Sequence, residues 1–202
     1  MSIKLQGLKT RILHHANTEA ALEHEIEHMQ HAIAHLYTAL TLTDTTFTQT
    51  RAIIKSIINQ CRTHENKQTI DMLTCTLNDV DRATVNCLPK ISTKVSYISQ
   101  SIARKRQQIF SNAEKIKTLK MLALSIQGQA NTLALRTQHI PLNTGETSFF
   151  MTNHIEALVN GIEHVATLSQ KNATKIEKVA TKIEQLSQLV QTLSVKLCEE
   201  KS

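Results

Sequence analysis

The chain has 202 residues, of which 41% are hydrophobic and 20% charged, and its formal net charge at pH 7 is +6. It contains only four Gly, two Pro, four Phe and two Tyr, and no Trp. This composition argues against β-sandwiches and barrels, whose frequent turns use Gly and Pro, and against doubly wound sheets with Gly-rich turns. Long helices with few breaks remain. Signature motifs of hydrolases and nucleotide-binding enzymes are missing, so we expect neither catalysis nor a cofactor.

Three turn signals divide the chain into four predicted helices. Residues 43–46 contain Asp and Thr, which cap helices through a side-chain oxygen. Pro89 lacks an N–H and fits a first helical position, and residues 139–145 contain Pro141 and Gly145. The predicted helices span 3–43, 47–86, 90–138 and 148–199. The second has a very polar stretch at 60–68, where it can bend or break.

Apolar residues recur in steps of three and four along these segments, which is typical of coiled coils. In the first helix they are Leu22, Ile26, Met29, Ile33, Leu36 and Leu40. The third and fourth helices carry longer heptad seams, which run from Ile91 to Leu133 and from Ile155 to Leu197. Ser169 and Asn172 make one polar step in the last seam, and such a step fixes register at a cost in stability.

The fold that these patterns predict is all-α. We expect one elongated domain over residues 1–202, a long antiparallel four-helix coiled-coil bundle built from two helical hairpins. The third and fourth helices should pack against each other, with Ile126 near Ile162 and Ala123 near Val165.

Four histidines, His24, His28, His31 and His35, lie along one stripe of the first helix. Histidines four apart on a helix can bind zinc, nickel or copper, and histidine also titrates near neutral pH. A solvated polar face explains the stripe equally simply, and we favour it over a metal site or a pH-responsive surface.

Basic residues are concentrated between Lys94 and Lys120. Arg104, Lys105 and Arg106 can contact phosphates, so a basic helical nucleic-acid-binding protein is one reading. Aromatic side chains for base stacking are almost absent. We therefore favour a solvated basic face.

The compartment that the sequence favours is the cytoplasm. Cys61, Cys75, Cys87 and Cys198 show neither metal-site pairing nor a dense disulfide pattern. No apolar run approaches the length of a membrane span, and the first residues have no signal-peptide core.

Residues 116–130 and 144–158 resemble the two arms of the signalling hairpin of methyl-accepting chemotaxis proteins. Leu122-Ala123-Leu124-Ser125 is similar to the family's L-A-L-N, and Gln129-Ala130 is similar to E-A. On the return arm, the run from Thr144 to Leu158 is similar to G-F-A-V-V-A-x-E-V-R-x-L.

The resemblance implies a cytoplasmic chemoreceptor-like signal-transduction protein, in which changes in bundle packing reach a hairpin tip that contacts a histidine kinase or coupling protein. The tip residues it implies are Leu122, Ser125, Gln129, Phe149, Phe150 and Asn153. A second hypothesis is a non-enzymatic scaffold or adaptor, such as a secretion or effector component, and a homo-oligomer is compatible with either.

Overall fold

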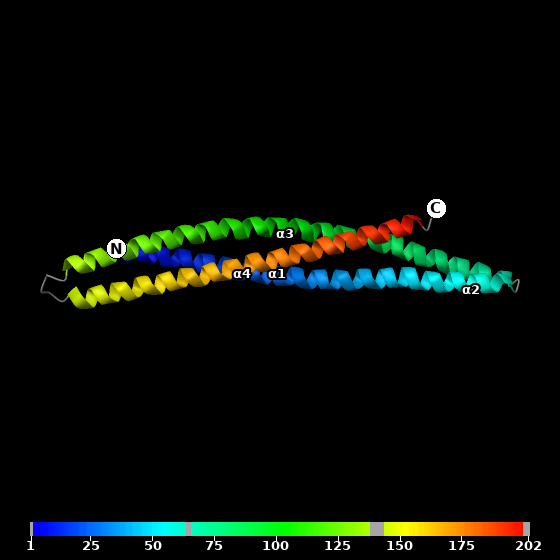
Figure 1. Cartoon of the computed structure of the whole chain (residues 1–202), viewed down its shortest axis with the longest axis horizontal. Coiled ribbons are helices and arrows are strands. Elements are labelled where there is room, and N and C mark those ends of the chain that lie inside the picture. Colours follow the sequence, from blue (N-terminus) through cyan, green and yellow to red (C-terminus); the bar gives the residue numbers. More distant parts are fainter. Residues whose placement is uncertain (1, 64–65, 138–143, 200–202) are drawn as a thin grey trace. The chain divides into compact units, whose positions relative to one another are not determined.

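The computed structural model describes residues 2–63, 66–137 and 144–199. Every described residue except Asn66 is helical, so the all-α prediction is confirmed. The elements are α1 (Ser2–Thr45), the π-helical turn η1 (Thr46–Thr50), α2 (Arg51–Thr63), α3 (Lys67–Thr137) and α4 (Thr144–Glu199) (Figure 1). Because α1, η1 and α2 follow one another without interruption, the described residues form three long helical stretches, and the predicted number of four helices is not confirmed.

The turn predicted at 43–46 is replaced by the continuous run from α1 through η1 into α2. Apolar burial explains this continuity. Leu40, Phe47 and Ile54 are all buried, so one face continues past the Asp and Thr residues. Arg51 is also buried, four residues after Phe47 and three before Ile54, so it lies on the same face. The π-helical turn η1 lies inside this run, and single π-helical turns occur within longer α-helices without ending them.

The turn predicted at 86–89 is also wrong, because α3 continues through Pro89. A proline inside a helix removes a hydrogen bond and costs about 3 kcal/mol. Leu88 and Ile91 on either side of it are buried in steps that continue to Val95 and Ile98. Since burying one such side chain contributes about 1.5–3 kcal/mol, the continuous apolar face offsets the cost of the proline.

The helices instead separate where the sequence is most polar. α2 ends at Thr63 and α3 begins at Lys67. The side chain of Asn66 accepts a hydrogen bond from the backbone N–H of Thr69 over 3.3 Å and so caps α3. The third predicted turn falls mostly outside the described residues, and α4 begins at Thr144, four residues before the predicted start.

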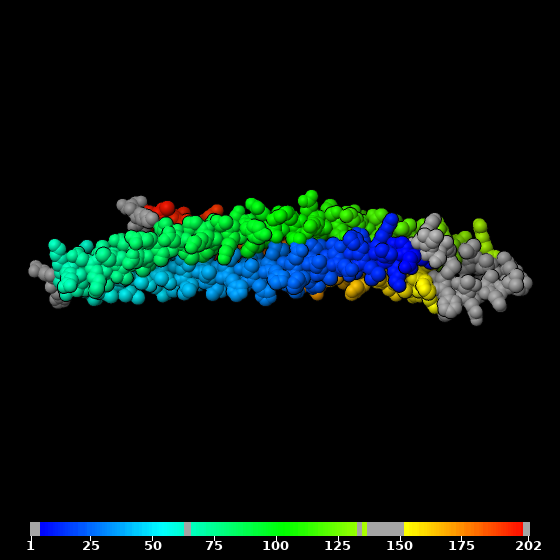
Figure 2. All heavy atoms as spheres, turned by 180° about the vertical axis from the view of Figure 1, so that it is seen from behind, coloured from blue at the N-terminus to red at the C-terminus, as the bar shows by residue number. Residues whose placement is uncertain are grey.

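The chain divides into two compact units. Unit 1 comprises Met1–Glu27 and Ala103–Glu177, and unit 2 comprises His28–Ile102 and Lys178–Ser202. Each unit is built from segments of α1, α3 and α4, and unit 2 also includes η1 and α2. Figure 2 shows the start of α1, in blue, against the green part of α3 within unit 1.

The core of unit 1 is one apolar cluster to which α1, α3 and α4 all contribute side chains. Leu8 and Ile12 come from α1, and Ile126 and Ile162 from α3 and α4. Ala123 and Val165 belong to the same cluster, as the predicted hairpin packing requires. The predicted seams of α3 and α4 are therefore on the buried face. The exceptions are Lys105 and Leu158, which are only half-buried, and Leu133, whose side chain lies outside those described.

Unit 2 buries a charged residue within its apolar face. Arg51 forms an ion pair with Asp81 of α3, and its guanidinium lies 5.4 Å from the ring centroid of Phe47. Burial of this arginine is tolerated because its positive charge is stabilised both by the carboxylate of Asp81 and by the aromatic face of Phe47.

Candidate functional site

Five polar side chains interrupt the apolar core of unit 1. They are His15 and Glu19 on α1, Asn112 on α3, and Ser169 and Asn172 on α4, and all five are buried. We call them the polar layer. Each occupies a position that continues the three-and-four spacing of its helix, so the periodicity that buries the neighbouring Ile and Leu residues also buries them.

Glu19 is the centre of the polar layer. Its side chain is fully buried, and its two carboxylate oxygens accept hydrogen bonds from two different helices. Asn112 Nδ2 donates to Oε1 over 2.5 Å, and Asn172 Nδ2 donates to Oε2 over 2.8 Å. Asn172 Nδ2 also lies 2.8 Å from the backbone carbonyl oxygen of Glu19. One carboxylate thus connects all three helices of unit 1.

His15 extends this network on α1. Its Nδ1 lies 2.5 Å from Asn112 Oδ1. Because an amide oxygen only accepts hydrogen bonds, Nδ1 must carry the proton in this arrangement. The resulting chain runs from His15 through Asn112 and Glu19 to Asn172.

Two atoms of the polar layer have no hydrogen-bond partner among the described residues. They are the Ser169 hydroxyl oxygen Oγ and Asn172 Oδ1. Ser169 is 3% exposed and Asn172 is fully buried. A buried polar group without a partner costs about 1–3 kcal/mol, so this packing of the layer is less stable than an apolar or fully bonded one.

Replacing Ser169 by Ala is therefore expected to stabilise the protein. The change removes a buried hydroxyl without a partner and should raise the melting temperature by about 2–4 °C for each kcal/mol gained. Thermal unfolding followed by circular dichroism measures this shift. Ser125→Ala, at an exposed position of α3, controls for the small helix-propensity gain of Ala over Ser. An equal shift in both variants would contradict the assignment.

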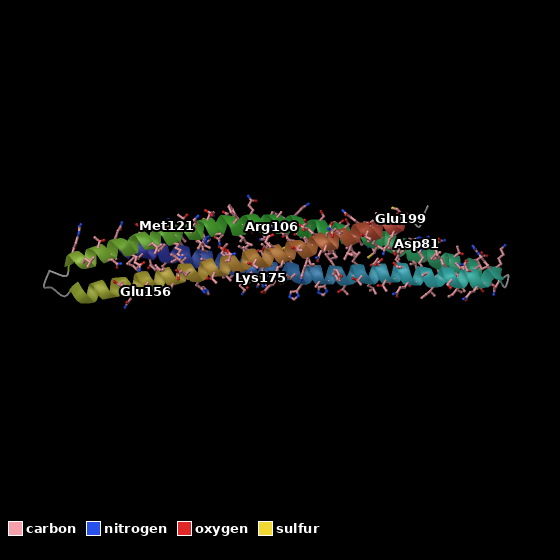
Figure 3. The ribbon with its side chains drawn as sticks, viewed as in Figure 1. Asp81, Arg106, Met121, Glu156, Lys175 and Glu199 are labelled. Carbon is pink, nitrogen blue, oxygen red and sulfur yellow. The ribbon has the colours of Figure 1, made fainter. Side chains whose placement is uncertain are left out.

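Ion pairs between the helices accompany the layer in unit 1. Lys175 of α4 lies 2.6 Å from Glu23 and 3.1 Å from Glu27 of α1, and Lys171 lies 2.9 Å from Glu23. Lys105 of α3 pairs with Glu25. Figure 3 labels Lys175 on α4. Glu23, Glu25 and Glu27 of α1 thus form ion pairs with lysines of both other helices.

These pairs shift the titration of two groups. Hydrogen bonds from Lys175 and then Lys171 lower the pKa of Glu23 below its ordinary value of 4.5. The hydrogen bond to Glu23, followed by that to Glu27, raises the pKa of Lys175 above its ordinary value. A lowered carboxylate pKa contributes stability above pH 4.5 that is lost as the pH falls through the folded-state pKa.

Glu23→Gln is accordingly expected to destabilise the protein at pH 7 by up to about 1 kcal/mol, since the pair is partly solvated. The difference from wild type should shrink below pH 4.5, where the wild-type carboxylate becomes protonated. Urea unfolding at pH 7, 5 and 3 measures this. Glu114→Gln, at an exposed position of α3, is the control and should show no such dependence.

Part of the polar layer is predictable from the sequence. Ser169 and Asn172 form the predicted polar step, and Asn112 lies within the predicted seam from Ile91 to Leu133. His15 and Glu19 were missed because the first seam was started at Leu22. The same spacing continued backwards from Leu22 falls on 19, 15, 12 and 8, and this signal identifies both residues.

The histidine stripe is exposed on α1. His24, His28, His31 and His35 all face away from the buried seam. Within residues 2–63, 66–137 and 144–199, no group of three His, Cys, Asp or Glu side chains is placed to hold a metal ion. Metal binding by this stripe stays a prediction that rests on pairs of histidines alone.

The three basic candidates do not form one surface. Lys105 pairs with Glu25 of α1, whereas Arg106 donates through Nε to Glu177 of α4 over 2.8 Å. Arg104 is exposed. Two of the three cations are therefore engaged by carboxylates on different helices, which lowers their availability for phosphate contacts.

The predicted tip residues lie on both arms of the hairpin. Leu122, Ser125 and Gln129 are exposed on α3, and Asn153 is exposed on α4. Phe149 and Phe150 belong to α4, but their side chains lie outside those that the structure describes. Across the described ranges, none of the helices is long and apolar enough to span a membrane.

Comparisons with known proteins give no functional assignment. No protein-family model matches the sequence, and no curated protein sequence matches it. A solved structure described as a computationally designed three-helix bundle is similar to this chain with a TM-score of 0.43 at 15% sequence identity. The similarity covers 99% of this chain and 88% of that one.

Proposed function

We propose that this chain is a non-enzymatic signal-transduction protein that acts through the packing of its helices. The observation that carries the proposal is the polar layer of unit 1, in which a fully buried Glu19 joins three helices while Ser169 Oγ and Asn172 Oδ1 have no partner in the described chain.

A switch of this kind requires two packings of the helices that differ little in free energy. A partner shifts a conformational equilibrium only if two packings lie within a few kcal/mol of each other. An entirely apolar seam favours one packing strongly. Groups that are incompletely bonded in one packing reduce that preference, because a rotation of α4 that pairs Ser169 and Asn172 regains part of their cost.

Methyl relaxation-dispersion NMR tests this proposal. Ile109, Ile116 and Ile176 lie three or four residues from Asn112 or Asn172, one helical turn away. Their methyl groups are expected to show exchange on the microsecond-to-millisecond timescale. Replacing His15, Glu19, Asn112 and Asn172 by Leu and Ser169 by Ala in one variant should abolish that exchange. Flat profiles in the wild-type protein would refute switching and leave a static scaffold as the better interpretation.

The resemblance to chemotaxis receptors supports a finer proposal. We propose that the end of α3 and the start of α4 contact a histidine kinase or its coupling protein. The exposure of Leu122, Ser125, Gln129 and Asn153 is consistent with such a contact, because these side chains are not used in the core.

A reconstituted kinase assay tests the finer proposal. The full chain, added to a chemotaxis-type histidine kinase and coupling protein, is expected to change the autophosphorylation rate. A variant with Leu122→Ala and Gln129→Ala should lose that effect, while Leu42→Ala, at an exposed leucine of α1 in unit 2, should keep it. A rate that the protein does not alter would contradict kinase coupling without affecting the proposal on helix packing.

A further inference from the structure

An open groove of about 620 Å³ runs between α3 and α4 in unit 1. Phe110, Ala113 and Lys117 line it on α3, and Ala166, Ser169 and Ala173 line it on α4. Small side chains allow a further backbone to approach closely. The volume alone does not identify an occupant, but Ser169 adds a second feature, because its buried hydroxyl has no partner in the described chain and lies in the groove lining.

The α3 wall of the groove continues as an exposed apolar stripe. Steps of three, four or seven residues separate Phe110, Ala113, Lys117, Leu124, Gly128 and Leu135. Phe110 is 71% exposed and Leu135 is 64% exposed. A Cβ added at Gly128 would meet no atom within 4 Å, so this position also faces open space. Heptad-spaced apolar residues outside the core are what a packed helix contacts.

The charge of the groove indicates which partner fits. Its lining contains three cations, Arg106, Lys117 and Lys120, and one carboxylate, Glu177. Arg106 pairs with Glu177, and Lys120 pairs with Glu163 of α4. Lys117, in the groove itself, has no ion pair within the described residues. A second copy of the chain would bring the same cations to the interface. An acidic helix would complement them instead.

We propose that the groove between α3 and α4 binds one acidic amphipathic helix of a partner protein, which becomes the fourth helix of unit 1. Its apolar face covers Phe110, Ala113 and Leu124, and its carboxylates lie near Lys117. The binding site itself does not depend on the proposed function. The proposal rests on that function only where it makes the bound helix the ligand that changes the packing of the polar layer through Ser169.

Binding of designed peptides to the full chain tests the proposal. The probe is a three-heptad amphipathic helix with Leu at the core positions and Glu at the flanking ones, and the comparison peptide carries Lys in place of Glu. Fluorescence anisotropy should show binding of the acidic peptide and at least tenfold weaker binding of the basic one. Phe110→Ala and Lys117→Glu should each weaken binding of the acidic peptide about tenfold.

Two matched variants serve as controls. Tyr97→Ala removes an exposed aromatic residue of α3 in unit 2, and Lys94→Glu reverses an exposed lysine there. Both should leave the affinity within about twofold of wild type, because they lie outside the groove.

The remaining outcomes separate this proposal from its alternatives. No binding of the acidic peptide, or equal binding of both peptides, overturns the proposal. Self-association that Phe110→Ala abolishes also overturns it, by identifying a second copy as the occupant. If the peptide binds in the groove but leaves the methyl exchange at Ile116 and Ile176 unchanged, the docking site stands and the switching function fails.

Discussion

Replacing Glu19 by Ala is expected to lower the free energy of unfolding by about 2–6 kcal/mol. The substitution removes the acceptor of hydrogen bonds from Asn112 and Asn172. Each buried N–H that loses its acceptor costs about 1–3 kcal/mol, and Asn172 keeps only its bond to the backbone carbonyl of residue 19. Water does not compensate readily, since Asn172 is fully buried and Asn112 nearly so. Urea unfolding followed by circular dichroism measures the change.

Glu156→Ala is the matched control, because Glu156 is an exposed glutamate on α4 (Figure 3). Its effect should stay within about 0.5 kcal/mol, as for most surface substitutions. Equal unfolding free energies for Glu19→Ala and wild type would mean that Glu19 does not join the three helices.

The second large effect is expected from Ile162→Asp. Ile162 is 1% exposed and belongs to the apolar cluster of unit 1. An aspartate there would bury a charge among Leu and Ile side chains with no cation opposite it, which should cost more than about 4 kcal/mol. Thermal unfolding should show a greatly lowered midpoint or no cooperative transition.

Asn160→Asp introduces the same side chain two residues away at an exposed position of α4. It should melt close to wild type. Ile183→Asp makes the corresponding change in the buried seam of unit 2 and should also destabilise strongly. If Ile162→Asp melts like wild type, the seam assignment is wrong.

Heptad spacing predicted the buried faces of α3 and α4 well, because burial of a continuous apolar stripe dominates the stability of long helices. The same physics explains the two wrong turns. Pro89 and the Asp and Thr residues at 43–46 are local signals worth at most a few kcal/mol. At both places the apolar face continues beyond the signal, so the helix continues as well.

The polar layer was only partly predictable for a different reason. A serine and an asparagine inside an apolar seam stand out in a single helix. Glu19 does not, because glutamate usually lies on the surface and becomes buried here only through partners 93 and 153 residues away. The pattern within one helix contains no information on which residues of another helix lie opposite.

The free energy of unfolding of a protein with an apolar layer tests the central claim most directly. In this variant His15, Glu19, Asn112 and Asn172 become Leu and Ser169 becomes Ala. Replacing buried polar groups by apolar residues of similar size often stabilises a protein by about 1–4 kcal/mol. We predict a gain in that range, because the layer lowers stability and makes a second packing accessible. A variant less stable than wild type would contradict the account, since the polar layer would then be what holds unit 1 together.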